Sequence, residues 1–361
     1  MKKPKLNYIL LGIASLLIFI GIFVLSSASA SSSWKEFSNT FYFLRHQILM
    51  GLIPGLILAF VAFKIPLELF KKYSLSTYIT SLMLTALVFL PALGTRIGGS
   101  ARWLQMGPVA FQPSELLKIG IILYFAFWLS QIEKDSKVPM IAFIIILIPA
   151  VLLLYLQPDT STLALTLAIA GLMYFAAETP WWHSLTLGGL GISGLFALIS
   201  LAPYRLERLM IFLKPGIDPM GVGYQLRQSL IAIGSGGIFG RGLGLSRQKF
   251  GFLPHAMSDS AFSILGEEAG FIGGVTLLLL FIAFLWQSLD IAKKAPNQFA
   301  KLTAVGITGW ITIQAFVNIG AMTGVIPLTG MPLPFISYGG SHLIAELIGV
   351  GILLNISKAS K

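Results

Sequence analysis

Long apolar stretches dominate this chain and constrain its fold more than any other feature. A helix needs roughly 20 mostly apolar residues to cross the hydrocarbon core of a membrane. Ten stretches of the 361-residue chain meet that requirement, at 8–28, 47–65, 76–93, 113–131, 139–157, 160–177, 184–202, 269–288, 302–322 and 338–357. We therefore expect a single all-α polytopic membrane domain over 1–361, with about ten transmembrane helices.

The composition agrees with a lipid environment. Hydrophobic residues make up 56% of the chain and charged residues only 11%, whereas a soluble domain carries about 25% charged residues. The net charge of +11 could indicate nucleic-acid binding. Membrane proteins, however, keep Lys and Arg on cytoplasmic loops and beside anionic lipid headgroups, so we expect no nucleic-acid partner. The absence of cysteine excludes disulfides and thiolate metal sites.

The distribution of Lys and Arg predicts the orientation of the spans. With the N-terminus inside, the cytoplasmic segments hold thirteen of the 25 Lys and Arg residues. The short outer loops hold only Lys35, Arg45, Arg96 and Arg102. Both termini are therefore predicted to be cytoplasmic. The first span ends in a motif typical of signal-peptidase sites at 28–30, but its apolar core is longer than that of a signal peptide, so we expect an uncleaved span.

Two segments are too polar to cross a membrane and too rich in Gly and Pro to be ordinary linkers, namely 94–111 and 204–268. Both are predicted to lie outside the cytoplasm. The second forms one large extracytoplasmic loop between the seventh and eighth spans. Connections of this length without structure of their own are uncommon and usually functional, so we expect the polar chemistry of the protein to lie there.

With no Cys and four His residues, carboxylates are the main candidates for a proton acceptor. Asp259 lies just before the eighth span, where a partly desolvated carboxylate could act as a general base. Capping of the helix that enters this span is the alternative interpretation. Glu115 and Lys118 lie three residues apart inside the fourth span. An ionisable pair there is costly and indicates function by default, although a purely structural ion pair is the alternative. Glu267 and Glu268 are interpreted as interface residues.

The large loop also combines a glycine-rich run at 234–244 with several cations. Glycines let the backbone approach a ligand and expose N–H groups to anions. The cations that could clamp a diphosphate are Arg205, Arg208, Arg241, Arg247 and Lys249. The run lacks the Gly-Lys-Ser/Thr ending of a Walker motif. A tight helical hairpin flanked by headgroup-binding cations is the alternative.

Pro and Gly are also dense at 327–341, between the last two spans. At membrane depth such backbone is tolerated only where it lines a cavity or is buried in protein, so we predict a re-entrant wall beside a polar site. His183 and His342 are expected to be packed or interfacial side chains rather than ligands. The residues alone thus leave open an enzyme acting on an anionic lipid, a flippase or a structural assembly protein.

At these motifs the chain resembles the SEDS family, the bacterial FtsW/RodA peptidoglycan glycosyltransferases, over nearly its whole length. The resemblance rests on Gly-Ser-Ala-Arg-Trp at 99–103, Phe-Gln-Pro-Ser-Glu-Leu-Leu-Lys at 111–118, and the segments 223–244, 252–259 and 332–341. Two further segments, 41–45 and 351–357, resemble FtsW, the division member, more than RodA. The chain departs from the family where Met-Ser-Asp-Ser at 257–260 replaces the usual His-Thr-Asp-Phe, and at Lys214 and Ser161.

The resemblance implies a multi-pass protein of the bacterial plasma membrane that polymerises lipid II, an undecaprenyl-diphosphate-linked disaccharide peptide, into glycan strands at the outer face during division. It implies a class B penicillin-binding protein and other division proteins as partners, at the septum. Asp259 matches the family's essential aspartate and is the expected catalytic residue. The expected substrate-binding residues are Arg102, Glu115, Lys118, Arg205, Arg208, Gln225, Arg241, Lys249 and Ser337. No metal ligand is assigned, although a divalent cation could share the diphosphate charge.

Overall fold

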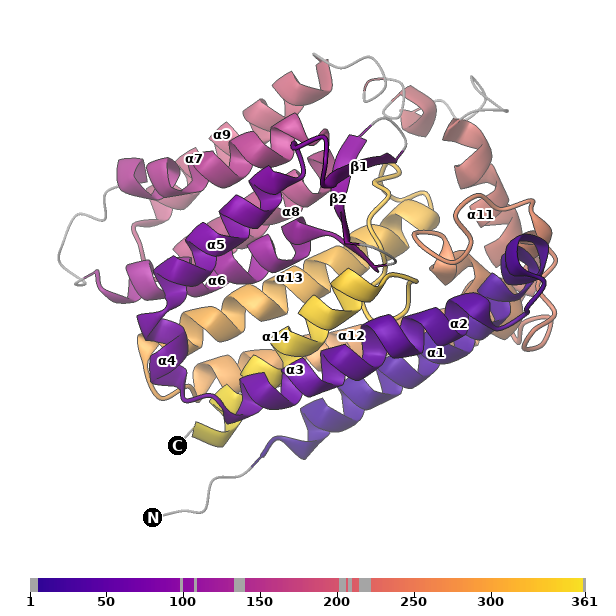
Figure 1. Ribbon diagram of the computed structural model, residues 1–361, viewed down its shortest axis with the longest axis horizontal. Helices are drawn as coiled ribbons and strands as arrows, with labels where there is room; N and C mark the ends of the chain where they lie inside the picture. Colours follow the sequence, from indigo (N-terminus) through magenta and orange to yellow (C-terminus); the bar gives the residue numbers. More distant parts are fainter. Residues whose placement is uncertain are drawn as a thin grey trace.

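The computed structural model describes residues 6–97, 100–106, 109–132, 140–200, 206, 210–213 and 222–359. Figure 1 shows a bundle of helices with a small sheet near one end. The helices are α1 (Tyr8–Phe37), α2 (Tyr42–Gln47), α3 (Ile53–Lys64), α4 (Leu67–Lys72), α5 (Ser74–Leu87), α6 (Pro113–Ser130), α7 (Met140–Leu156), α8 (Thr160–Ala176), α9 (Trp181–Ser200), α11 (Val222–Gly236), α12 (Ala261–Lys293), α13 (Gln298–Met322) and α14 (Gly340–Ala359). A π-helical segment, η1 (Ile48–Leu52), joins α2 to α3, and a 3₁₀ turn, η2 (Gln248–Phe250), precedes α12.

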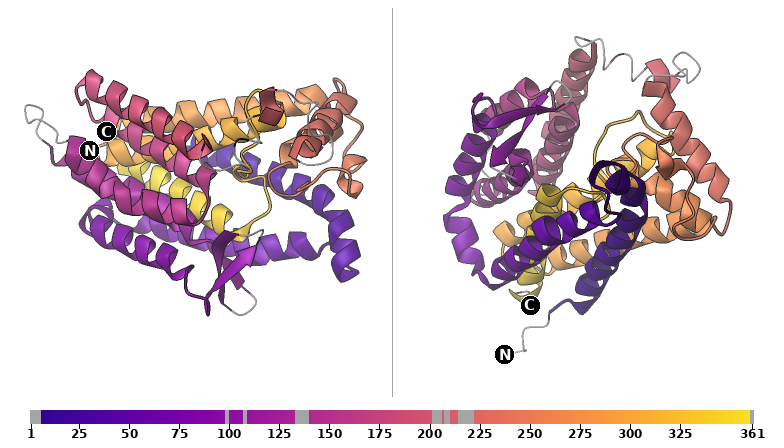
Figure 2. Two further views of the ribbon diagram at one scale, coloured as in Figure 1. Left: turned by 90° about the horizontal axis from the view of Figure 1, so that it is seen from above. Right: turned by 45° about the vertical axis from the view of Figure 1, so that its right-hand side comes forward.

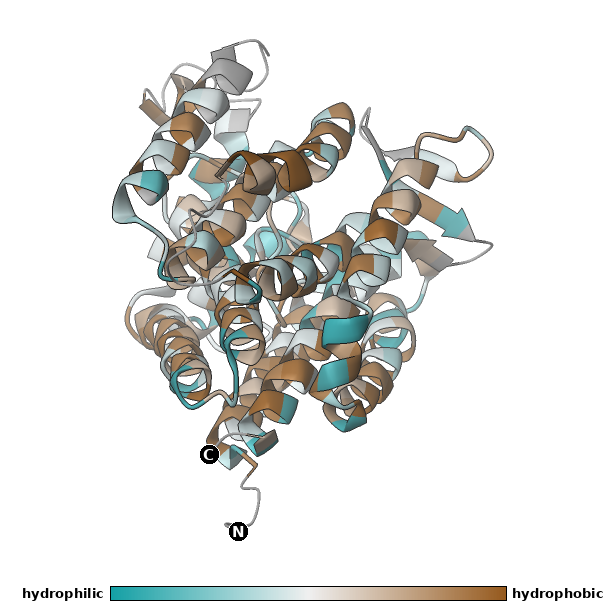
Figure 3. Cartoon of the chain, turned by 90° about the vertical axis from the view of Figure 1, so that its left-hand side faces the viewer, coloured by the Kyte–Doolittle hydropathy of each residue, from teal (hydrophilic) through white to brown (hydrophobic). Residues whose placement is uncertain are grey.

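Among the described residues, six helices are long and apolar enough to cross a membrane. They are α1, the continuous helix Tyr42–Lys64, α6, α12, α13 and α14. The helices α5, α7 and α8 are apolar but shorter. Many large apolar side chains are exposed on the bundle, and Figure 3 shows hydrophobic residues along most of its helices. The expectation of a helical polytopic membrane protein is confirmed with at least these six spans, and the number ten stays a prediction.

A three-stranded antiparallel sheet interrupts the helical architecture and was not predicted from the sequence. Its strands are β1 (Gly94–Ile97), β2 (Ser100–Met106) and β3 (Val109–Phe111), in that order. Gly94 pairs with Leu104, and Leu104 in turn pairs with Phe111. Strands this short carry too little alternation of polar and apolar residues to be distinguished from a loop. The sheet directly precedes α6 and places Arg102 near the start of α8.

The two ends of the described chain meet at one end of the bundle. The backbone N–H of Asn7 donates a hydrogen bond to Ser357 Oγ over 3.3 Å. The sheet and α11 lie toward the other end, in the view of Figure 1 and in both views of Figure 2. This arrangement agrees with the prediction that both termini lie on the same side of the membrane. That this side is the cytoplasmic one stays a prediction.

The helix α12 begins earlier than the predicted eighth span, at Ala261 instead of residue 269. It is broken at Gly270, whose φ of 67° is non-helical. Glycine takes such a left-handed conformation without a steric penalty. The first turns of α12 therefore belong to the predicted loop 204–268, which also contains α11 and η2.

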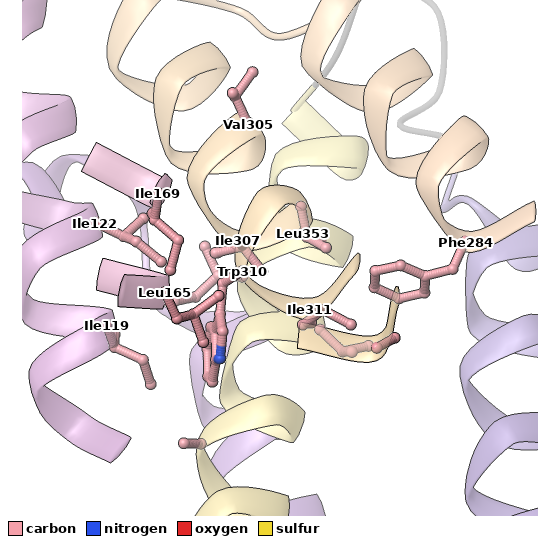
Figure 4. Packing of buried hydrophobic residues seen from close by; sticks show 14 of the residues in the cluster. Ile119, Ile122, Leu165, Ile169, Phe284, Val305, Ile307, Trp310, Ile311 and Leu353 are labelled. Atoms are coloured by element: carbon pink, nitrogen blue, oxygen red, sulfur yellow. The ribbon is translucent and has the colours of Figure 1, made fainter. Parts of the chain in front are cut away.

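The apolar core surrounds α13. Trp310 of this helix is fully buried. Figure 4 shows side chains of α6, α8 and α14 arranged around it, among them Ile122, Leu165, Ile169 and Leu353. Because α13 is surrounded by other helices, polar side chains along it must find their partners inside the protein.

Close packing of α14 on α3 depends on glycine. A Cβ atom at Gly351 would lie 2.3 Å from the backbone oxygen of Ala59. A Cβ atom at Gly55 would likewise lie 2.6 Å from Leu347 Cδ1. Small residues at helix interfaces allow backbones to approach closely in membranes, where no hydrophobic force drives helices together.

We expect Gly351→Ala to lower the free energy of unfolding by about 1–3 kcal/mol, as overpacking of a tight contact does. The measurement is thermal unfolding in detergent. Gly12→Ala is the matched control, because a Cβ atom at Gly12 in α1 has no neighbour within 4 Å. Equal melting temperatures for the two variants would contradict the role assigned to Gly351.

Candidate active site

A polar cavity of about 360 Å³ lies among β2, α6, α8, α11, α13 and the loops that precede α12 and α14. Its lining gathers charged and amide side chains from segments far apart in the sequence. They include Arg102, Gln112, Glu115, Lys118, Asp159, Gln225, His255, Asp259, Gln314, Tyr338 and His342. Five of these, Arg102, Glu115, Lys118, Gln225 and Asp259, are among the residues proposed from the sequence.

The Asp259 carboxylate lines the cavity instead of capping α12. Its Oδ2 accepts a hydrogen bond from Gln225 Nε2 at 3.1 Å, and its Oδ1 accepts one from Ser258 Oγ at 3.0 Å. The N-cap residue of α12 is Ser260, and its hydroxyl donates to the backbone oxygen of Pro254 at 2.9 Å. The capping interpretation of Asp259 is therefore wrong. The residue is only 8% exposed, so its carboxylate is largely shielded from bulk solvent.

The backbone around Asp259 is fixed by two amide side chains from neighbouring helices. Asn318 Nδ2, on α13, donates to the Asp259 backbone oxygen at 2.8 Å and to that of Met331 at 2.7 Å. Gln225 Nε2, on α11, also lies 3.1 Å from Ser260 Oγ. A carboxylate held in one orientation in this way is suited to act on a bound group.

Glu115 and Lys118 form a buried ion pair in the wall of the same cavity. Lys118 Nζ lies 2.9 Å from Glu115 Oε2 and 3.3 Å from Gln314 Oε1. It also lies 4.7 Å from the ring centroid of Trp310. Gln314 Nε2 donates in turn to the backbone oxygen of Pro332 at 2.9 Å. Glu115 and Lys118 therefore form a buried ion pair, as the structural alternative proposes. The same two side chains also line the cavity.

Arg102 lies at the edge of the cavity, positioned by β2. Its Nη2 donates to the backbone oxygen of Pro158 at 2.6 Å, and its Nη1 lies 3.9 Å from Asp159 Oδ1. Asp159 in turn caps α8 by accepting from the Thr162 N–H at 3.3 Å. The Arg102 side chain is 35% exposed, so the guanidinium is oriented by the protein and still accessible to an anion.

The structure does not bring Arg241 and Lys249 to the cavity. Lys249 Nζ donates to Glu268 Oε1 at 3.1 Å and to Ser27 Oγ of α1 at 2.7 Å. Arg241 Nε lies 3.8 Å from Glu267 Oε1. Both glutamates are buried, which corrects their interpretation as interface residues. A buried carboxylate needs partners. Lys249 supplies one for Glu268, whereas Glu267 accepts hydrogen bonds from Ser246 and from the backbone N–H groups of Arg247 and Gln248, with Arg241 farther away.

The glycine-rich run packs against protein backbone. A Cβ atom at Gly240 would lie 2.1 Å from the Glu268 backbone oxygen, and one at Gly236 would lie 2.1 Å from the Gly266 backbone oxygen. Backbone hydrogen bonds join the two segments, including Arg241 N–H to the Glu267 oxygen at 3.0 Å. These glycines therefore let the chain approach α12 closely. This contact agrees with the tight hairpin that was the alternative to a ligand-binding loop.

Three predicted site residues remain, namely Arg205, Arg208 and Ser337. Arg205 and Arg208 fall outside the described residues. Ser337 supports the site from behind: its Oγ donates to the Ser258 backbone oxygen and accepts from the Leu333 N–H at 2.8 Å.

The segment 327–341 forms part of the cavity wall, as predicted, and its re-entrant position in the membrane stays a prediction. Residues 329–332 together with Tyr338 and Gly339 line the cavity. The Tyr338 hydroxyl lies 3.0 Å from His46 Nδ1.

The other six of these lining residues were not proposed as site residues from the sequence, namely Gln112, Asp159, His255, Gln314, Tyr338 and His342. Gln314 and His342 are polar side chains within apolar spans, a pattern that often marks a functional interior. Within the described residues no group of three or more His, Asp or Glu side chains converges as a metal site would. A divalent cation therefore stays a hypothesis.

We expect Lys118→Met to lower the free energy of unfolding by about 3–5 kcal/mol, because it leaves Glu115 buried without a partner charge. The double variant Glu115→Gln/Lys118→Met should lose less, since neither charge is left unpaired. Denaturant titration in detergent measures both. Lys294→Met is the control, because the Lys294–Asp290 pair is exposed and contributes about 1 kcal/mol or less. A Lys118→Met variant as stable as this control would refute the expectation.

Comparison with known proteins identifies the family to which this chain is similar. The family model for FtsW, RodA and SpoVE, described as a cell cycle protein, matches residues 7–361. Stage V sporulation protein E of Bacillus subtilis (strain 168) is 40% identical over 366 aligned positions, which cover 100% of this chain and 99% of that protein. A protein of Geobacter sp. (strain M18), named as a probable peptidoglycan glycosyltransferase FtsW, is 38% identical over 354 positions, covering 97% and 96% of the two chains.

Two solved structures have a fold similar to that of this chain over almost its full length. One from work on the structural coordination of polymerization and crosslinking by a peptidoglycan synthase complex superposes with a TM-score of 0.78 at 30% identity, covering 98% of this chain and 97% of that one. The crystal structure of the Thermus thermophilus rod shape determining protein RodA gives a TM-score of 0.72 at 29% identity, covering 98% and 96%. The chain belongs to the SEDS family of FtsW, RodA and SpoVE proteins.

Proposed function

We propose that this protein is a peptidoglycan glycosyltransferase that polymerises lipid II at the outer face of the plasma membrane, with Asp259 as its general base. The enzyme class follows from relatives that match nearly the whole chain and are named as probable peptidoglycan glycosyltransferases. The observation that carries the role of Asp259 is its geometry. Its carboxylate lines a polar cavity and is held there by Gln225 and Ser258.

In the proposed reaction, Asp259 accepts the proton of the 4-hydroxyl of an acceptor GlcNAc. The freed oxygen attacks the anomeric carbon of a lipid-diphosphate-linked donor, and the bond from that carbon to the diphosphate breaks with inversion. The transition state is oxocarbenium-like, as in glycoside hydrolysis. A positioned base typically contributes about 10²–10⁴-fold to the rate. Orientation of two membrane-held substrates supplies much of the remainder.

Stabilisation of the departing diphosphate is assigned first to Arg102. Its guanidinium is oriented by the Pro158 carbonyl and is partly exposed at the cavity edge. Planar guanidinium groups bind phosphate oxygens in a bidentate manner. Arg205 and Arg208 are retained as further candidates on the basis of family resemblance. The Glu115–Lys118 pair would shape the polar wall that the substrate contacts.

A division role is the finer part of the proposal. It is supported by the FtsW-like segments 41–45 and 351–357 and by FtsW relatives that cover nearly the whole chain. One SEDS homologue has been solved in work on a peptidoglycan synthase complex. We therefore propose a class B penicillin-binding protein and other division proteins as partners. Fluorescence imaging in growing cells should place the protein at the septum, and an even distribution along the side wall would instead favour an elongation role.

We expect Asp259→Ala and Asp259→Asn each to lower lipid II polymerisation by about 10²-fold or more, because both remove the proton acceptor. The assay incubates purified protein and a partner transpeptidase with lipid II and resolves the glycan products on gels. Asp290→Asn is the control, since Asp290 lies at the opposite end of α12, in an exposed pair with Lys294. Full polymer formation by Asp259→Ala would reject the assignment of the base.

The same preparations distinguish the main rival functions. A flippase would move lipid II across sealed vesicles and would continue to do so without Asp259. A structural assembly protein would show neither activity and would tolerate the loss of both Asp259 and Glu115. Polymerisation that depends on Asp259 is the result that the proposed function requires.

A further inference from the structure

A second carboxyl group, Glu346 of α14, is buried near the site without lining the cavity. It is 0% exposed. Its Oε2 accepts a hydrogen bond from the backbone N–H of Phe335 at 2.8 Å, while its Oε1 has no hydrogen-bond partner among the described residues. An ionisable side chain inside an apolar span is costly and indicates function by default. Any role of Glu346 must therefore act through its hydrogen bond to Phe335.

Phe335 adopts a backbone conformation that needs external support. Its φ of 63° lies in the left-handed region, which is a clear outlier for a bulky residue. Such conformations persist only when the surrounding structure holds them. On one side Glu346 binds the Phe335 N–H. On the other side α1 packs so closely that a Cβ atom at Gly21 would lie 2.1 Å from the Phe335 oxygen.

Phe335 belongs to the segment 332–341, which we name the re-entrant turn, and this turn holds the backbone that carries Asp259. The Tyr338 N–H donates to the Met257 oxygen at 2.7 Å. Ser337 Oγ donates to the Ser258 oxygen. The two residues immediately before Asp259 are thus bound to the turn that Glu346 fixes.

We propose that Glu346 is a positioning residue for the reaction: it locks the re-entrant turn through Phe335, and the turn in turn holds the Asp259 carboxylate in its place. The inference rests on the proposed role of Asp259 as base. Because Glu346 does not line the cavity, its loss should act through the turn on the Asp259 carboxylate, while Arg102 and Glu115 stay held by β2 and α6. A misplacement of about 1 Å from a mutation far from the chemistry can cost about 10²-fold in rate.

The test compares Glu346→Leu with Glu346→Gln. Leucine fills a similar volume but accepts no hydrogen bond, whereas glutamine keeps an acceptor oxygen for the Phe335 N–H. In lipid II polymerisation, Glu346→Leu should lower kcat by about tenfold or more. Its KM should stay within about twofold of the parent value, because removal of an interaction made only in the transition state lowers kcat and kcat/KM together. Glu346→Gln should keep kcat within about threefold of the parent value.

A second measurement does not depend on activity. Hydrogen–deuterium exchange followed by mass spectrometry reports protection of the Tyr338 amide, which is bonded to Met257. Protection should fall in Glu346→Leu and persist in Glu346→Gln. If the parent protein does not polymerise lipid II, the proposed function fails, and the exchange data still decide whether Glu346 holds the turn.

Asn355→Leu is the matched control for general destabilisation of α14. Asn355 is buried on the same helix, and its Nδ2 donates to the Ala62 and Ile65 oxygens at 2.9 and 2.5 Å, far from the cavity. This variant should melt at lower temperature with kcat per folded molecule and Tyr338 protection unchanged. The inference is overturned if Glu346→Leu keeps both kcat and protection, if Glu346→Gln fails as severely as Glu346→Leu, or if activity falls only in proportion to unfolded protein.

Discussion

Polar groups enclosed by an apolar bundle must find their partners inside the protein, and the rest of this structure depends on that requirement. Unpaired backbone or side-chain groups at membrane depth cost several kcal/mol each. The amide side chains of Gln225, Gln314 and Asn318 meet this requirement, because they donate hydrogen bonds to a carboxylate and to loop carbonyls. The irregular backbone beside the cavity is stable because helices α11 and α13 supply these donors. The same hydrogen bonds that satisfy these polar groups also build the wall of the polar cavity.

The sequence alone predicted the helical membrane architecture, since each span needs only a long apolar run. It also predicted that the segment 327–341 lines a cavity, because a backbone rich in Pro and Gly is stable at membrane depth only beside a cavity or inside protein. The sequence could not decide whether Asp259 caps α12 or lines a cavity, because both kinds of aspartate have the same neighbours in sequence. Its partner Gln225 lies on a different helix and meets Asp259 only in the folded protein.

The cations of the large loop illustrate a second limit. Lys249 and Arg241 were proposed as diphosphate ligands because they lie near glycines in the sequence. In the folded protein, Glu267 and Glu268 are buried and pair with them. A cation near a glycine-rich turn cannot be assigned to a ligand or to a buried carboxylate until the burial of that carboxylate is known. The short strands of the sheet were missed for a related reason, since their pairing is a property of three segments together.

Charges in this protein therefore fall into two groups that respond differently to ionic strength. The pairs Glu115–Lys118 and Lys249–Glu268 are buried, and salt screens buried pairs much less than exposed ones. Arg102 is partly exposed at the cavity edge, where attraction of an anionic substrate would be screened over about 8 Å at physiological salt. Raising the salt concentration would thus weaken the capture of a diphosphate lipid while leaving the internal framework of the fold intact.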